Sequence, residues 1–207
     1  VKGKIQDTFY NTTTGRFAWS VRDVDAMGNK KGEKAKGTLM DYGFTELNLH
    51  AVAAGVASDT QADSIMRWIN GTREVSGDKV SGTDIYGNGT YGQPFAPVTT
   101  TADNQKYSTD GSNITSVRES DFSEYYYDKK YGVQCQDGGT IMHVSYYDIL
   151  ARAKVLGAEN AYGRISAIAS WFAKVQAKNP NAATEGWQDF FANYYNGSGD
   201  LQGEDGA

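Results

Sequence analysis

The chain has 207 residues, of which 39% are hydrophobic and 13% aromatic, and its formal net charge is −5. This length can bury one substantial core or two modest ones. The acidic balance argues against a nucleic-acid partner, because a phosphate backbone requires a clustered basic surface. No apolar run approaches the roughly 20 residues of a membrane span. The two histidines have no zinc-like spacing and Cys135 is alone, so we expect neither a metal site nor an internal disulfide.

Residues 1–40 predict short strands and turns. Lys4 to Tyr10 is rich in β-prone residues, and the turn cluster Asn11 to Gly15 separates it from a second β-prone run, Arg16 to Val21.

A first helical hairpin is predicted next. Thr45 to Ala57 carries apolar residues at close to helical spacing. Ser58 then begins a capping box with Gln61, and an amphipathic helix follows that ends at Gly71. Because the connection is only a few residues long, the two helices must be antiparallel neighbours.

A second hairpin follows the long, Gly-rich stretch 71–139, which we expect to be a functional loop. Thr140 to Leu156 and Glu159 to Lys178 predict two helices separated by Gly157, and a short helix is expected near Trp187 to Asn193. The two hairpins match each other at an offset of 100 residues, from Ala51 to Ala151. Similar hairpins repeated along a chain favour radial packing.

Two carboxylates lie at the start of the first hairpin. Asp41 and Glu46 are five residues apart, and side chains at a helix N-terminus can face an open cavity. We therefore consider both as catalytic groups. The structural alternative is that Asp41 caps the helix and Glu46 is an ordinary acid of its first turn.

Other polar residues are candidates for binding sugar hydroxyl groups. Gln136 and Asp137 precede two glycines that allow a ligand to approach the backbone, and His143 follows one turn into the next helix. Asp84 and Tyr86 can line a further subsite. Capping and rigid loops are the structural alternatives. We find no phosphate-binding motif and expect no cofactor, which leaves paired carboxylates, the equipment of glycoside hydrolysis.

Three segments carry a resemblance to a known family. Residues 42–49, residues 136–139 with 145–152, and residues 201–203 resemble bacterial six-hairpin glycosidases over about residues 7–205. The resemblance implies a mainly α fold, an (α/α) toroid of antiparallel hairpins with long irregular loops and a few short strands. It also implies a glycoside hydrolase with two carboxylates, commonly an inverting one, and a carbohydrate substrate contacted by residues such as Tyr42. Asp137 is then better interpreted as a sugar ligand than as a catalytic acid.

Two hairpins are fewer than a six-hairpin ring requires. We therefore expect residues 1–207 to be part of a single (α/α)6-type catalytic domain that is incomplete at both ends, with one catalytic carboxylate lying outside it. A periplasmic or secreted location is slightly favoured over a cytoplasmic one, and the oligomeric state is not predicted. The alternatives are a non-catalytic carbohydrate-binding toroid, or a sugar phosphorylase or polysaccharide lyase on the same fold.

Overall fold

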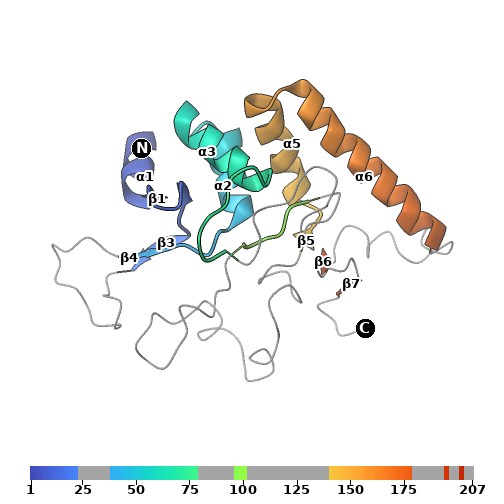
Figure 1. Cartoon of the computed structure of the whole chain (residues 1–207), viewed down its shortest axis with the longest axis horizontal. Coiled ribbons are helices and arrows are strands. Elements are labelled where there is room, and N and C mark those ends of the chain that lie inside the picture. Colours follow the sequence, from blue (N-terminus) through green and yellow to red (C-terminus); the bar gives the residue numbers. More distant parts are fainter. Residues whose placement is uncertain (23–37, 79–95, 102–139, 179–193, 196–200, 203–207) are drawn as a thin grey trace, which may run out of the picture.

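A computed structural model describes residues 1–22, 38–78, 96–101, 140–178, 194–195 and 201–202. This part of the chain is mainly helical with a few short strands, as predicted (Figure 1). The helices are α1 (Lys2–Phe9), α2 (Thr45–Ala53), α3 (Asp59–Ile69), α5 (Val144–Val155) and α6 (Ala158–Lys178). The strands are β1 (Tyr10–Asn11), β2 (Arg16–Phe17), β3 (Ser20–Arg22), β4 (Thr38–Met40), β5 (Thr140–Ile141), β6 (Tyr194–Tyr195) and β7 (Leu201–Gln202).

The N-terminal segment differs from its prediction. Lys4 to Tyr10 was expected to be extended, but residues 2–9 form α1. Ile5 and Phe9 lie four residues apart and therefore share one face of this helix, which packs against the core. The turn after it is as predicted: the amide of Gly15 donates to the Asn11 carbonyl over 2.7 Å, and β1 pairs with β2 in antiparallel register.

The first hairpin consists of α2 and α3. The capping box is confirmed, because Ser58 accepts from the Gln61 amide and the Gln61 side chain accepts from the Ser58 amide. Gly71 follows α3 with φ +75, and the amides at positions 71 and 72 donate to carbonyls at 68 and 67. This is the Schellman pattern. The first helix ends at Ala53, earlier than predicted, because Gly55 already adopts φ +71.

The second hairpin consists of α5 and α6, separated by Gly157 with φ +93. Its first helix begins at Val144 and not at Thr140. Thr140 and Ile141 form β5 instead, which pairs with β6, and β6 pairs with β7. The helix predicted at residues 187–193 lies outside the described residues.

The two hairpins lie side by side, and α2 runs parallel to α5 (Figure 1). Glu46 contacts His143, and one turn further along both helices His50 contacts Tyr147. Burial also repeats at the predicted offset of 100 residues. Positions 45, 48, 51 and 52 are buried, as are 145, 148, 151 and 152, while positions 46 and 50, like 146 and 150, are more open to solvent. The first helices of the two hairpins, α2 and α5, therefore bury equivalent positions.

The buried face of both hairpins forms one core, to which α2, α3 and α5 contribute. Its largest fully buried side chains include Trp68, Leu49, Ile65 and Met66. A buried ionic group fastens the second hairpin: Asp148 pairs with Arg152 at 2.8 Å and with Arg164 at 2.6 Å. Arg152 also donates to Asn70 at the end of α3, over 2.8 Å, and so ties the two hairpins together.

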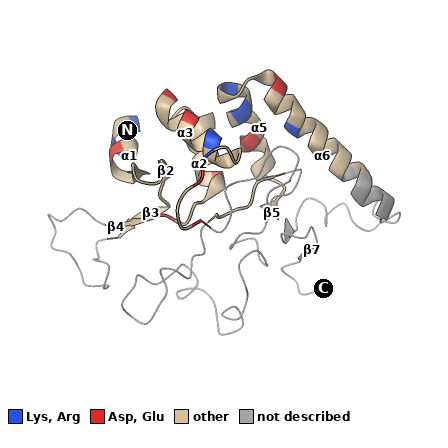
Figure 2. Cartoon of the chain, viewed as in Figure 1, with Lys and Arg blue, Asp and Glu red and all other residues tan. Residues whose placement is uncertain are grey.

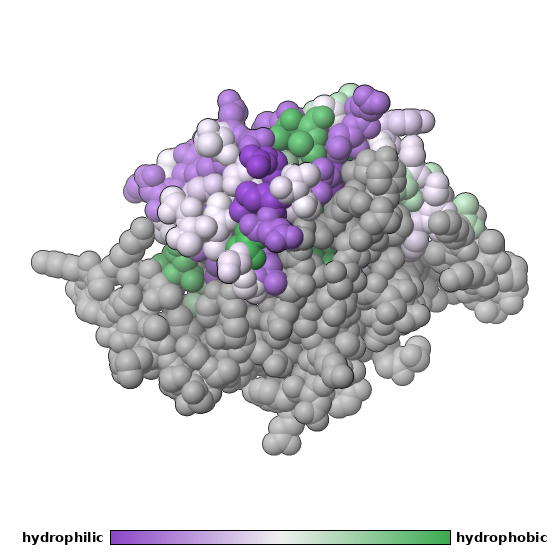
Figure 3. Space-filling view, in the orientation of Figure 1, coloured by the Kyte–Doolittle hydropathy of each residue, from purple (hydrophilic) through white to green (hydrophobic). Residues whose placement is uncertain are grey.

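The described surface is mostly polar in the view of Figure 3, with only small hydrophobic areas. Basic and acidic residues are interspersed along the described helices and do not form one basic stripe in the view of Figure 2. No helix in the described part of the chain is long and apolar enough to cross a membrane.

Candidate functional site

Asp41 is buried, with 3% of its surface exposed. One carboxylate oxygen accepts from Arg16 Nε over 2.7 Å and from the Gly43 amide over 3.0 Å. The other accepts from Thr14 Oγ1 over 2.6 Å and from Asn11 Nδ2 over 3.2 Å. Both oxygens are thus occupied by protein donors, as expected of an anchoring group. This environment favours the structural alternative for Asp41 over the catalytic one.

Arg16 extends the Asp41 network across the fold. Its guanidinium binds Asp78 through two nitrogens, at 2.6 and 3.0 Å, and lies 4.6 Å from the ring centroid of Trp68. Burial lowers the pKa of Arg16, but hydrogen bonding to Asp78 and the charges of Asp41 and Asp78 outweigh it and raise the pKa above its ordinary value. Arg16 therefore keeps its positive charge, and the network around it joins β2 to the segments that flank α2 and α3.

Tyr42, predicted to bind substrate, is also buried, with its ring packed edge-on against Phe44. Trp19 is exposed in this region, and its ring also contacts Phe44. Tyr42 therefore packs in the interior of the described part of the chain.

Glu46 is the accessible carboxylate at the start of α2. Its side chain is 37% exposed, and it lies between both histidines of the chain. Oε1 is 3.2 Å from Nε2 of His143 and 3.8 Å from Nε2 of His50. An ionised carboxylate only accepts hydrogen bonds, so the contact with that form of Glu46 is made by the tautomer of His143 that carries its proton on Nε2. Two residues predicted separately, Glu46 as a catalytic group and His143 as a binding residue, are thus brought together across 97 residues of sequence.

Aromatic side chains continue this surface along α5. The ring centroids of His50 and Tyr147 are 3.4 Å apart, and Tyr147 packs edge-on against Tyr146 at 5.0 Å. Tyr146 is 62% exposed, and Leu150, one turn further on, is also exposed. We name these six residues the α2–α5 face: Glu46, His50, His143, Tyr146, Tyr147 and Leu150.

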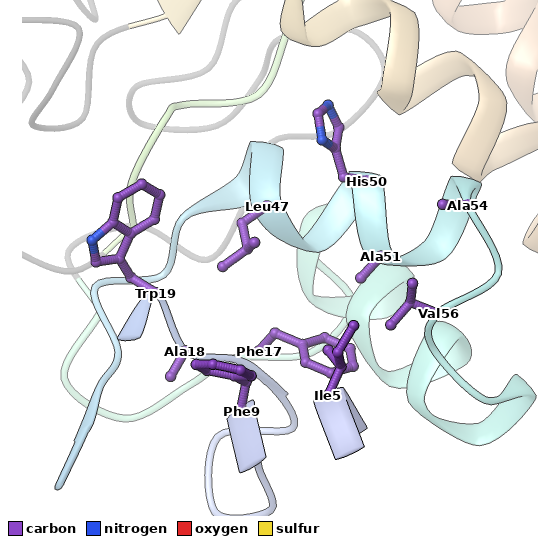
Figure 4. Close-up of a pocket in the computed structure, with 10 residues that line it drawn as sticks. All are labelled: Ile5, Phe9, Phe17, Ala18, Trp19, Leu47, His50, Ala51, Ala54 and Val56. Atoms are coloured by element: carbon purple, nitrogen blue, oxygen red, sulfur yellow. The ribbon is translucent and has the colours of Figure 1, made fainter. Parts of the chain in front are cut away.

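An apolar pocket of about 330 Å³ lies on the other flank of α2 (Figure 4). It is formed by side chains of α1, of β2 and the two residues after it, of α2 and of the segment after α2: Ile5, Phe9, Phe17, Ala18, Trp19, Leu47, His50, Ala51, Ala54 and Val56. In Figure 4, His50 rises from α2 on the side away from Ile5 and Phe9. This histidine therefore borders both the pocket and the α2–α5 face.

His50 and Tyr147 were not among the residues proposed from the sequence. Each lies one turn after a predicted site residue, Glu46 and His143 respectively, so helical spacing was the signal that could have identified them. The other predicted binding residues, Asp84, Tyr86, Gln136 and Asp137, lie outside the described residues. Within the described ranges, no three His, Cys, Asp or Glu side chains are grouped so that they could hold a metal ion.

Comparisons with family models, curated proteins and solved structures give no match to this chain. The six-hairpin resemblance therefore stays a prediction.

Proposed function

We propose that this chain belongs to a glycoside hydrolase in which Glu46 is one of two catalytic carboxylates. The observation that carries the proposal is the α2–α5 face, where the accessible carboxylate of Glu46 contacts His143 near the exposed ring of Tyr146. A carboxylate can transfer a proton to or from a glycosidic oxygen or a water molecule. Tyrosine rings offer flat apolar faces with a polar edge, which suits a sugar ring.

The proposed fold is an (α/α) toroid, and the parallel packing of α2 and α5 supports it. In a ring of hairpins, the first helices of successive hairpins lie parallel and bury equivalent positions, as α2 and α5 do. Both flanks of the pair are also apolar. The pocket beside Leu47 lies on one flank, and exposed Tyr162 and Ile165 of α6 lie on the other. Further hairpins of the same design would cover these flanks.

The reaction requires a second carboxylate. It lies about 5–5.5 Å from the first in retaining enzymes and about 6.5–9.5 Å from it in inverting ones. Asp41 is a poor candidate because its oxygens already accept four hydrogen bonds. The second group is therefore expected outside the described residues.

Replacing Glu46 by Gln tests the proposal, with kcat/KM measured on a panel of aryl glycosides and oligosaccharides. Loss of general acid–base catalysis is expected to lower kcat/KM by roughly 100- to 10,000-fold. Glu159→Gln is the matched control, because Glu159 is an exposed acid in the first turn of α6. Its activity should stay at the wild-type level.

Other outcomes point to the alternatives. If the wild-type protein binds oligosaccharides but hydrolyses none of the panel, the non-catalytic carbohydrate-binding protein is favoured. Phosphate-dependent cleavage would indicate a phosphorylase, and unsaturated uronate products would indicate a lyase. Unchanged turnover in Glu46→Gln would remove this residue from catalysis.

A further inference from the structure

Glu46 lies between two imidazole rings supplied by two different helices. His143 belongs to the start of α5, and its Nε2 reaches Oε1 over 3.2 Å. His50 belongs to α2 itself, one turn after Glu46, and its Nε2 is 3.8 Å from the same oxygen. The first distance is that of a hydrogen bond, and the second is too long for one.

The side chain of His50 is fixed from its other face. Its ring lies against Tyr147, with centroids 3.4 Å apart. Its Nε2 atom is shielded from solvent and makes no hydrogen bond to a described residue. Among the described residues, Glu46 is the carboxylate closest to this atom, so His50 and Glu46 lie against each other.

The second oxygen of Glu46 remains open to a ligand. Within the described part of the chain, Oε2 accepts no hydrogen bond, and the side chain is partly exposed. Fixing Oε1 restricts rotation of the carboxylate and hence the direction in which Oε2 points. Holding a reacting group in one orientation lowers the entropy cost of reaching the transition state.

We propose that His143 is a positioning residue that holds Glu46 through Oε1 and aims Oε2 at the substrate, while His50 and Tyr147 limit the movement of the carboxylate on the opposite side. This inference rests on the proposed function, since it assigns His143 a role in the same reaction. It also revises the sequence-based prediction, in which His143 contacted the substrate directly.

The activity test compares two substitutions at position 143. His143→Gln keeps an N–H donor near the place of Nε2, whereas His143→Leu keeps bulk and removes the donor. We expect His143→Leu to lower kcat by roughly ten- to 100-fold with KM changed less than about twofold. His143→Gln should recover most of the lost kcat. If His143→Leu keeps wild-type kcat, or if it changes KM alone, the positioning role is refuted.

A second measurement tests the hydrogen bond between His143 and Glu46 and requires no substrate. In the wild-type protein, the ¹H and ¹⁵N chemical shifts of the His143 Nε2–H report its hydrogen bond to Glu46. Glu46→Ala removes the acceptor and should move these shifts, while Glu159→Ala should leave them unchanged. Unmoved shifts in Glu46→Ala would overturn the proposed contact. Moved shifts in a protein that hydrolyses no glycoside would keep the contact and refute only the proposed function.

Discussion

Asp41 and Glu46 lie five residues apart, yet their surroundings predict opposite consequences when each is replaced by its amide. In Asp41→Asn, the new Nδ2 takes the place of an oxygen that accepts two hydrogen bonds. If Nδ2 takes the place of Oδ1, it faces the N–H groups of Arg16 and Gly43, and two hydrogen bonds are lost. If it takes the place of Oδ2, it faces the Asn11 amide donor while the Thr14 hydroxyl can turn to accept, and one hydrogen bond is lost. In both cases Arg16 keeps only one carboxylate partner, Asp78.

The expected loss of stability is about 3 kcal/mol. A buried hydrogen bond to a charged group contributes about 1.5–3 kcal/mol, and breaking a buried ion pair from one side costs about 3–5 kcal/mol in total. Because the ion pair between Arg16 and Asp78 is retained, we expect the loss of stability to lie at the lower end of the range for a broken ion pair. With a urea m-value of roughly 2 kcal/mol/M, the unfolding midpoint should fall by about 1.5 M.

Glu46→Gln is expected to leave the stability of the protein almost unchanged, in contrast to Asp41→Asn. Its side chain is partly exposed, and the amide can still meet His143, so the free energy of unfolding should change by less than about 0.5 kcal/mol. Activity should nevertheless be lost. Urea unfolding followed by tryptophan fluorescence and a glycosidase assay on the same samples separate the two effects. If Asp41→Asn keeps the wild-type midpoint but loses activity, the structural role argued for Asp41 is wrong and its catalytic role is restored.

Three further predictions follow from other parts of the structure. Gly43→Ala should lower the free energy of unfolding by about 1–3 kcal/mol, measured in urea, because position 43 has φ +66 and a Cβ there would collide with buried side chains. Gly77→Ala is the control and should cost less, because its Cβ would meet nothing within 4 Å. Ser58→Ala removes the capping hydroxyl and should cost about 1 kcal/mol by the same measurement, so an unchanged midpoint would argue against the capping box. Tyr146→Ala should raise KM severalfold on oligosaccharides with little change in kcat. Tyr162→Ala removes a similarly exposed tyrosine on α6 and should change neither constant. Equal effects of the two substitutions would refute a sugar-binding role for Tyr146.

The elements that the sequence predicted correctly are those specified by local patterns. The capping box at Ser58 and the glycine after α3 act within a few residues, and so they can be read from sequence. The failures have non-local causes. Thr140 and Ile141 leave the predicted helix because they pair with strand residues 194–195, more than 50 positions later. The helical form of residues 2–9 depends on packing Ile5 and Phe9 against the core.

The same distinction applies to the site. Both acids near the start of α2 can be identified in the sequence, but no local pattern shows which is a buried anchor and which is an accessible carboxylate. The two differ in their partners, which are distant in sequence: Arg16 lies 25 residues before Asp41, and His143 lies 97 residues after Glu46. A pattern search along one helix cannot detect such partners, because they are set by how β2 and α5 pack against α2.

The internal match between the hairpins suggests why the α2–α5 face combines these residue types. At the offset of 100 residues, Glu46 corresponds to Tyr146 and His50 to Leu150, and all four are more open to solvent than the neighbouring core positions. The two hairpins thus place equivalent positions on one shared face but fill them differently, with ionisable groups on α2 and with apolar groups on α5. Because a sugar requires both a reacting acid and a flat surface to lie on, this division gives each hairpin a separate part in the proposed function. A further hairpin of the same design would present its own equivalent position beside these, and that position is where we would search for the second carboxylate.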